Sequence, residues 1–344
     1  MSITGEHFAE MQAILQEAIR FYQPKVVCFL LSGGHDSFTS TYFAYEAMTR
    51  LYRETNWLMP VDAPQFKVVH VDTGIGLPET RAHVEKVSQL LNWPLCVYKT
   101  PESYEAIVKQ YGFPGPSAHR FMYIRLKERA LVQLVRDHTP QSPWKARLSE
   151  ALAQSRVLPL NWFRLYLFAL EQEYKLYVKS DEYRNYQEQR KSKLLFLTGV
   201  RLDESVRRMG HVKAIQVQGR RIWVAPMLNV SKAEIIDFMW SISPSFRSPV
   251  VETLHMSGEC LCGSFSHPGE LAEITFWFPE TGAYLRELER IVQGEGFPWG
   301  WEDAPANWWN EMKQGQLFLP GFSPLCSSCQ ASHEANEGLC HDCI

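Results

Sequence analysis

Short apolar runs alternate with amphipathic segments along the first 240 residues of the chain. The apolar runs, which have the length and β-branched content of strands, lie at 25–31, 66–71, 95–98, 194–200 and 222–225. The amphipathic segments, with apolar residues at helical spacing, begin at residues 5, 37 and 78. Another helix is expected after Ser231, which forms a capping-box pattern with Glu234. This order predicts an α/β fold: a parallel sheet with right-handed crossovers, flanked by helices.

A glycine loop joins the first predicted strand to the helix that follows it. The loop reads Ser32, Gly33, Gly34, His35, Asp36, Ser37. Unpaired N–H groups and the positive dipole end at a helix start attract anions, and glycines let phosphate oxygens approach the backbone. The Asp36 carboxylate would repel such a phosphate unless a cation such as Mg²⁺ lay between them. The loop predicts a phosphate and Mg²⁺ site; the alternative is a turn that only begins the helix.

A second polar motif, Asp72, Thr73 and Gly74, directly follows the strand at 66–71. Ligands of parallel sheets bind beyond the carboxyl ends of the strands, so this motif and the glycine loop are expected to share one crevice. Asp72 can accept hydrogen bonds from a ribose or an adenine amino group, or hold Mg²⁺ through water. The alternative is that Asp72 caps the turn that follows it.

Two basic segments add candidate phosphate ligands. Gly199 ends the run at 194–200, and Arg201, Arg207 and Arg208 follow it. The glycine permits close approach of a base or ribose, and the arginines can neutralise charge on phosphates. The alternative is an amphipathic basic helix.

The other basic segment precedes and enters a helix. It contains His119, Arg120 and Arg125, which can bind a phosphate or sulfate through charge-assisted hydrogen bonds. A solvated basic face is the preferred interpretation for Lys127 and Arg129.

Residues 139–193 interrupt the sheet pattern and are predicted to be a helical insertion. They contain ten Lys and Arg against six Asp and Glu, a net charge of +4 in a chain of −3. They also contain nine aromatic residues, and basic residues interleaved with aromatics suit nucleic-acid phosphates and bases. The alternative is a helical subdomain with an aromatic core, because Trp162, Leu165, Tyr166 and Ala169 keep helical spacing.

From about residue 245 the composition shifts to Pro, Gly, Trp and Cys, which predicts a domain at 1–244 and a small Cys-rich domain at 245–344. Two C-x-x-C pairs close the chain: Cys326 with Cys329, and Cys340 with Cys343. Four such thiolates suit one tetrahedral Zn²⁺. The alternative is a [4Fe–4S] cluster held by Cys260 and Cys262 with one of the C-x-x-C pairs, or a sulfur relay through Cys260 and Cys262.

The net charge and the hydropathy of the whole chain narrow the classes of protein to which it can belong. A net charge of −3 argues against a surface that coats nucleic acid generally. No apolar run reaches the roughly 18 residues of a membrane span, and no signal-peptide core is present at the N-terminus. We therefore expect a cytoplasmic protein without a membrane partner, whose cysteines serve metal or sulfur chemistry rather than disulfides.

Three of these motifs resemble one superfamily. Ser-Gly-Gly-His-Asp-Ser resembles the pyrophosphate loop of the adenine nucleotide α-hydrolases, which include ATP pyrophosphatases and phosphoadenosine-phosphosulfate (PAPS) reductases. The segments HVDTGIGLPET and GVRLDESVRR resemble their strand-end motifs. The resemblance implies a Rossmann-like PP-loop fold that binds ATP at Ser32–Ser37, Asp72–Gly74, Gly199 and Arg201. It also implies Mg²⁺, with Asp36, Arg201, Arg207 and Arg208 as the catalytic residues.

The chain keeps the Gly-Gly-x-Asp-Ser loop and lacks the Glu-Cys-Gly-x-His signature of true PAPS reductases. This favours ATP cleavage between the α- and β-phosphates, with adenylation of an acceptor for sulfur transfer. The chain is thus similar to the ATP-pyrophosphatase subunit of DNA phosphorothioation systems, which implies DNA as substrate and a cysteine desulfurase as sulfur donor. The alternatives are thiol-dependent PAPS reduction and a nucleotide-sensing, nucleic-acid-binding subunit without turnover. The last is kept because His35 stands where many relatives carry Lys.

Overall fold

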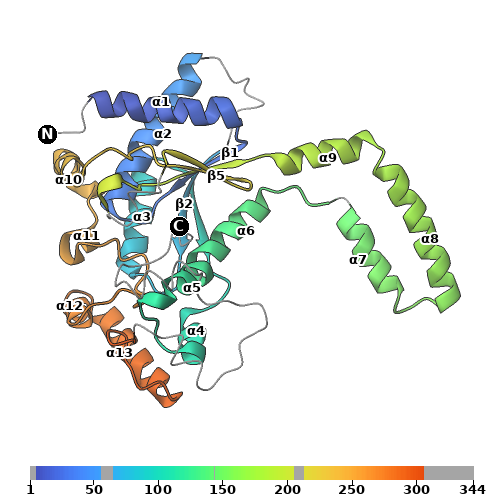
Figure 1. Cartoon of the computed structure of the whole chain (residues 1–344). Helices are drawn as coiled ribbons and strands as arrows, with labels where there is room; N and C mark the ends of the chain where they lie inside the picture. Colours follow the sequence, from blue (N-terminus) through green and yellow to red (C-terminus); the bar gives the residue numbers. More distant parts are fainter. Residues whose placement is uncertain (1–4, 56–64, 143, 205–212, 306–344) are drawn as a thin grey trace.

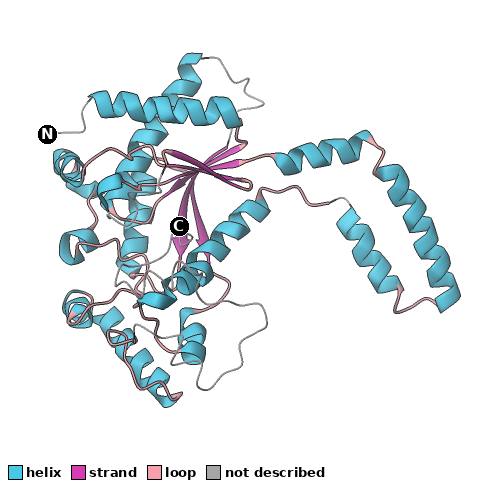
Figure 2. Ribbon diagram, in the orientation of Figure 1, coloured by secondary structure: helices cyan, strands magenta, loops and turns pink. Residues whose placement is uncertain are grey.

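A six-stranded sheet organises the computed structural model, which describes residues 5–55, 65–142, 144–204 and 213–305. The strand order is β3-β2-β1-β4-β6-β5 (Figures 1 and 2). The strands are β1 (Val26–Leu30), β2 (Gln65–Asp72), β3 (Leu95–Lys99), β4 (Leu194–Leu197), β5 (Ile215–Gln218) and β6 (Arg221–Val224). Five strands are parallel, and the edge strand β5 pairs antiparallel with β6. The predicted α/β class is confirmed; the short β5, which exposes most of its side chains, was not predicted.

Helices cover both faces of the sheet. Val27 and Phe29 of β1 point to one face, where they pack against α1 (Gly5–Tyr22), α2 (His35–Thr55), α3 (Pro78–Leu90) and α10 (Lys232–Ser241). Val26 and Cys28 point to the other face, where α6 (Arg129–Asp137) covers them. Because both faces are buried, the strands read as continuous apolar runs in the sequence.

The region after residue 245 packs against the first part of the chain. One apolar cluster joins Ile75 and Leu77, which follow β2, to Val250, Leu261 and Ile274. The helices around this cluster are α4 (Tyr104–Tyr111), α5 (His119–Tyr123), α11 (Pro249–Leu254), α12 (Glu270–Trp277) and α13 (Pro279–Gly294). This shared core holds residues 257–262 beside the loop after β2.

The predicted insertion forms three helices that project from the body as an arm, residues 144–191 (Figure 1). They are α7 (Trp144–Gln154), α8 (Leu160–Tyr177) and α9 (Asp181–Lys191). Arg220 holds the two ends of the arm together: its guanidinium donates to the Ser192 carbonyl at 3.0 Å and to the Thr139 hydroxyl. Within the described residues, no helix combines the length and apolar character needed to cross a bilayer.

Candidate nucleotide site

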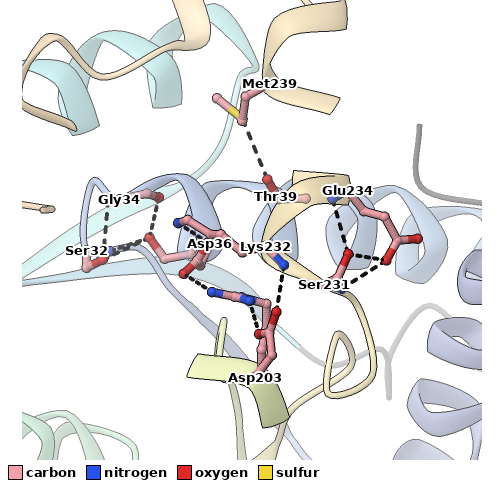
Figure 3. Close-up of polar contacts among 11 residues, drawn as sticks. Ser32, Gly34, Asp36, Thr39, Asp203, Ser231, Lys232, Glu234 and Met239 are labelled. Carbon is pink, nitrogen blue, oxygen red and sulfur yellow. Dashed lines mark hydrogen bonds and ion pairs between the residues drawn. The ribbon is translucent and has the colours of Figure 1, made fainter. Parts of the chain in front are cut away.

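Ser37 fixes the glycine loop between β1 and α2 through contacts with Ser32 and Gly34, which Figure 3 labels. Its hydroxyl accepts from the Ser32 N–H at 3.1 Å and donates to the Gly34 carbonyl at 2.9 Å. Gly33 has φ +89°, and a Cβ there would lie 2.6 Å from Cγ2 of Thr80. The loop therefore requires glycine at 33, and it delivers its backbone directly to the N-terminus of α2, where donors for an anion are exposed.

Asp36, on the first turn of α2, is held by two cations. Its carboxylate accepts from Arg201 at 3.1 Å and from the Lys232 ammonium at 3.0 Å. Arg201 is only 3% exposed, and its guanidinium also pairs with Asp203. Asp203 in turn accepts from the Lys232 backbone N–H at 2.8 Å. Two carboxylates and two cations thus form one network at the mouth of the loop (Figure 3).

Sequence reasoning missed Lys232 and Asp203. Lys232 is the first residue of α10, directly after the capping residue Ser231. That position was readable, because a side chain on the first turn of a helix after a strand end lies at the same edge of the sheet as the glycine loop. Asp203 had no comparable signal, since it lies in a short 3₁₀ turn.

The carboxylates of Asp36 and Asp203 bind the same guanidinium, so both lie beside the glycine loop. Hard carboxylate oxygens beside a phosphate site are the ligands that Mg²⁺ prefers, so the residues fit this ion. Within the described residues, no group of three or more His, Cys, Asp or Glu side chains forms a metal site. The fit therefore needs oxygens from a bound nucleotide or from water in addition to the protein.

His35 brings no positive charge to the loop. Burial, together with the neighbouring charges of Lys232 and Arg247, lowers the pKa of His35 to about 4. The imidazole is thus neutral at pH 7. Positive charge reaches the loop from α10 instead, where the Lys232 ammonium binds Asp36 at 3.0 Å.

Gly199, after β4, and the motif at Asp72, at the end of β2, lie on the two strands that flank β1. A Cβ on Gly199 would lie 2.7 Å from the backbone of Asp36 and Ser37, so β4 presses directly on the loop. Asp72 caps its own turn by accepting from the Gly74 N–H at 3.0 Å, and it pairs with Arg81 at 3.0 Å. Asp72 thus makes the turn-capping contact that the sequence left as the alternative.

Residues 257–262 bind the loop after β2 along its length. Thr73 donates to the Glu259 carbonyl at 2.7 Å, and Leu261 donates to the Ile75 carbonyl at 3.1 Å. The same segment reaches the glycine loop, because a Cβ on Gly34 would lie 3.1 Å from Cβ of Ser257. The segment that carries Cys260 and Cys262 therefore lies beside both predicted nucleotide motifs.

Cys260 and Cys262 form a hydrogen-bonded thiol pair beside Lys127. The hydrogen bond from Cys260 lowers the pKa of the Cys262 thiol. A second hydrogen bond, with the Ser264 hydroxyl 3.3 Å from the Cys262 sulfur, lowers this pKa further. The bond between the two thiols raises the pKa of Cys260, and burial of Cys260 raises it further. Lys127 binds Glu259 at 2.6 Å. One thiol of the pair is therefore the easier to ionise, the condition for a nucleophilic sulfur.

In the basic segment at 119–125, side chains that were predicted to bind an anion contact other protein groups. The guanidinium of Arg125 binds Glu102 at 2.5 Å and lies 4.5 Å from the ring centre of Phe121. Arg125 is thus engaged in the protein interior, which does not favour its predicted phosphate role. His119 contacts the Phe265 ring with centroids 4.6 Å apart, and Arg120 is half-buried.

Two groups of predicted site residues lie outside the described residues. They are the predicted catalytic Arg207 and Arg208 and the predicted metal ligands Cys326, Cys329, Cys340 and Cys343.

The family model described as phosphoadenosine phosphosulfate reductase domain matches residues 26–243. No curated protein matches the chain. Among solved structures, PAPS reductase from Candida auris in a phosphate complex is 16% identical with a TM-score of 0.34, covering 70% of this chain and 88% of that one.

Two further solved structures bind or modify other substrates. FMN adenylyltransferase from Candida glabrata, with FAD and inorganic pyrophosphate, is 12% identical with a TM-score of 0.39, covering 72% of this chain and 59% of that one. The U34-tRNA thiolase of Methanococcus maripaludis with its [4Fe–4S] cluster is 13% identical with a TM-score of 0.28, covering 84% and 81%.

Proposed function

The chain belongs to the phosphoadenosine phosphosulfate reductase domain family, and on that premise we propose that it cleaves ATP to pyrophosphate and transfers AMP to an acceptor for sulfur transfer. The observation that carries the proposal is the intact glycine loop. Ser37 closes it, and Asp36 is held beside it between Arg201 and Lys232.

Each residue has a role in this reaction. The backbone N–H groups at the N-terminus of α2 hold the β- and γ-phosphates. Arg201 and Lys232 neutralise charge that builds up on the leaving pyrophosphate. Gly199 leaves room for the ribose or base. Mg²⁺, when bound, would be held by Asp36 with support from Asp203 and would supply further neutralisation of the phosphates.

Sulfur transfer explains why AMP is attached to the acceptor. Adenylation turns a poor oxygen leaving group into AMP, and a sulfur nucleophile can then displace it. The thiol pair of Cys260 and Cys262, bound to the loop after β2, supports this second half-reaction. The sulfur donor would be a cysteine desulfurase.

Substitution of Asp36 tests the ATP chemistry. With ATP and Mg²⁺ the wild-type protein should release pyrophosphate when the acceptor is present, and Asp36→Asn should reduce release at least 100-fold, as loss of a single charged catalytic contact does. Glu46→Gln, an exposed change on α2, is the control. Release of ADP and orthophosphate would contradict the proposal, and tight binding of PAPS with release of sulfite would favour the reductase.

For the acceptor we propose a nucleic acid, DNA in the first instance, on the +4 charge of residues 139–193. Affinity should then fall with salt at a slope of about −0.9 per phosphate contact. Charge reversal at Lys175 and Lys179, both exposed on the arm, should flatten the slope by roughly one to two units. Binding that is undetectable at about 50 mM salt would leave an ATP pyrophosphatase with a different acceptor.

A further inference from the structure

The segment that follows α10 packs beside the glycine loop. It contains a 3₁₀ turn that ends at Phe246, whose ring stacks on Phe38 of α2 with centroids 5.8 Å apart. The His83 imidazole of α3 interacts with the Phe246 backbone. On the same turn of α3, Thr80 packs against Gly33 of the loop. Two helices that meet the loop therefore also hold the end of this 3₁₀ turn.

Arg247 is the residue that follows the turn, and its side chain is only 14% exposed. Its guanidinium lies 4.2 Å from the ring centre of Trp240, a cation–π contact. Trp240 is on α10, the helix that also brings Lys232 to the loop. The positive charge of Arg247 helps to lower the pKa of His35, so the guanidinium is near enough to act on a charged group bound at the loop.

Buried nitrogen atoms without a hydrogen-bond partner are found around the loop. Among the residues that the structure describes, these include Nε of Arg247, Nε of Arg201 and Nε2 of His35. A guanidinium Nε–H is always a donor, so each arginine leaves a buried donor unsatisfied. Such donors are costly and are nearly always paired in folded proteins, so they indicate acceptor oxygens from a bound group. Phosphate oxygens meet this requirement.

Arg247 is held less firmly by carboxylates than the other two cations of the site. Arg201 and Lys232 bind the Asp36 carboxylate at 3.1 and 3.0 Å. The carboxylate beside Arg247 belongs to Glu252, which lies 3.5 Å from the guanidinium and is 45% exposed. A half-exposed pair at that distance is weak, so a phosphate can displace Glu252 from Arg247.

We propose that Arg247 binds the terminal phosphates of ATP and the pyrophosphate that leaves, and that Trp240 positions its guanidinium. The inference rests on the proposed ATP chemistry and extends it to a residue beyond 26–243, the range that the family model matches. A planar guanidinium can bind two oxygens of one phosphate, which supplies orientation as well as charge. AMP lacks these phosphates, so Arg247 distinguishes ATP from AMP.

Isothermal titration of the full-length chain in Mg²⁺ tests the contact, with inorganic pyrophosphate and AMP as the probes. Arg247→Gln should raise the Kd of pyrophosphate at least about tenfold and leave the Kd of AMP unchanged. Trp240→Leu should raise the Kd of pyrophosphate by a smaller factor, because the cation remains but is no longer held in place. Arg286→Gln, which removes an exposed arginine on α13, is the matched control and should change neither value.

Glu252→Gln distinguishes a phosphate ligand from a structural residue. Loss of the carboxylate that competes for Arg247 should lower the Kd of pyrophosphate about twofold or more, a gain that damage to the fold would not produce. In the Arg247→Gln background the same change should have no effect. An unchanged Kd of pyrophosphate in Arg247→Gln would overturn the role of Arg247 and leave the ATP chemistry standing. A wild type that binds neither pyrophosphate nor ATP would overturn both.

Discussion

Gly199 and Asp36 are in backbone contact: a Cβ on Gly199 would lie 2.7 Å from the carbonyl carbon of Asp36. The contact joins the end of β4 to the first turn of α2, which lie 163 positions apart in the chain. It fixes the position of the glycine loop relative to Arg201, which lies two residues after Gly199. The guanidinium of Arg201 binds the Asp36 carboxylate.

Gly199→Ala should therefore push the loop away from β4. We expect a loss of about 1–3 kcal/mol in the free energy of unfolding, the range of overpacked sites, and weaker ATP binding. Gly294→Ala is the control, because a Cβ at Gly294 meets no atom within 4 Å. Chemical denaturation measures the first effect and nucleotide titration the second; unchanged values for Gly199→Ala would show that the contact relaxes without cost.

Lys232→Met should raise the KM for ATP about tenfold or more, because an ammonium that binds Asp36 beside the glycine loop is lost. Stability should change little, since the Lys232 side chain is 48% exposed and such ion pairs contribute little to folding. Lys232→Arg should recover part of the affinity. Steady-state kinetics give the KM of each variant. Lys213→Met, which removes an exposed lysine elsewhere, is the control that separates a local charge effect from a general one.

The buried imidazoles predict a dependence of stability on pH. The pKa values of His35 and His83 are both lowered to about 4, by burial first. Between pH 6.5 and pH 4 the unfolded chain binds these protons and the folded chain does not, so stability should fall as the pH falls through that window. His35→Gln should reduce this decline in Tm; a decline of full size in the variant would assign the effect to other groups.

Alkylation should distinguish the cysteines. Cys262 should react with iodoacetamide rapidly at pH 7, because its lowered pKa leaves more thiolate, and Cys260→Ala should slow it by removing the hydrogen bond. Cys28 is the internal control, since burial raises its pKa to about 12. Peptide mass mapping over time gives each rate, and equal rates at Cys262 and Cys28 would argue against a reactive thiol.

The C-terminal cysteines are expected to bind metal. Cys326→Ser with Cys329→Ser should lower the metal content of anaerobically purified protein and its thermal stability, because binding energy at a structural site is also folding energy. Cys28→Ala should leave the content unchanged. A visible absorbance near about 400 nm would identify an iron–sulfur cluster and its absence would favour zinc, since Zn²⁺ has a filled d shell.

Local patterns predicted most of the fold. The runs at 25–31 and 66–71 became β1 and β2, and Ser231 with Glu234 forms the predicted capping box, because each depends on neighbours in sequence. The glycine loop was also readable, since its glycines and its helix are contiguous.

Contacts between distant segments could not be read in this way. Lys232 reaches Asp36 across 196 positions, and Glu259 accepts from Thr73 across 186. The capping box at Ser231 places Lys232 at the glycine-loop edge of the sheet, but it does not show that Lys232 contacts Asp36. The exposure of Trp162, 65%, was hidden for a similar reason: helical spacing shows that a stripe is apolar, but not what covers it.

The way the arm is attached to the body has an evolutionary consequence. Arg220 binds both Thr139 and Ser192 and so holds the two ends of the arm together. The arm is therefore a closed loop between α6 and β4, and its length does not change how its ends meet the sheet. The entropy of closing a loop grows only slowly with its length, so an arm of this kind can lengthen, shorten or be exchanged with little effect on the sheet. Lineages could thus change what the protein assembles with while the nucleotide chemistry stays the same.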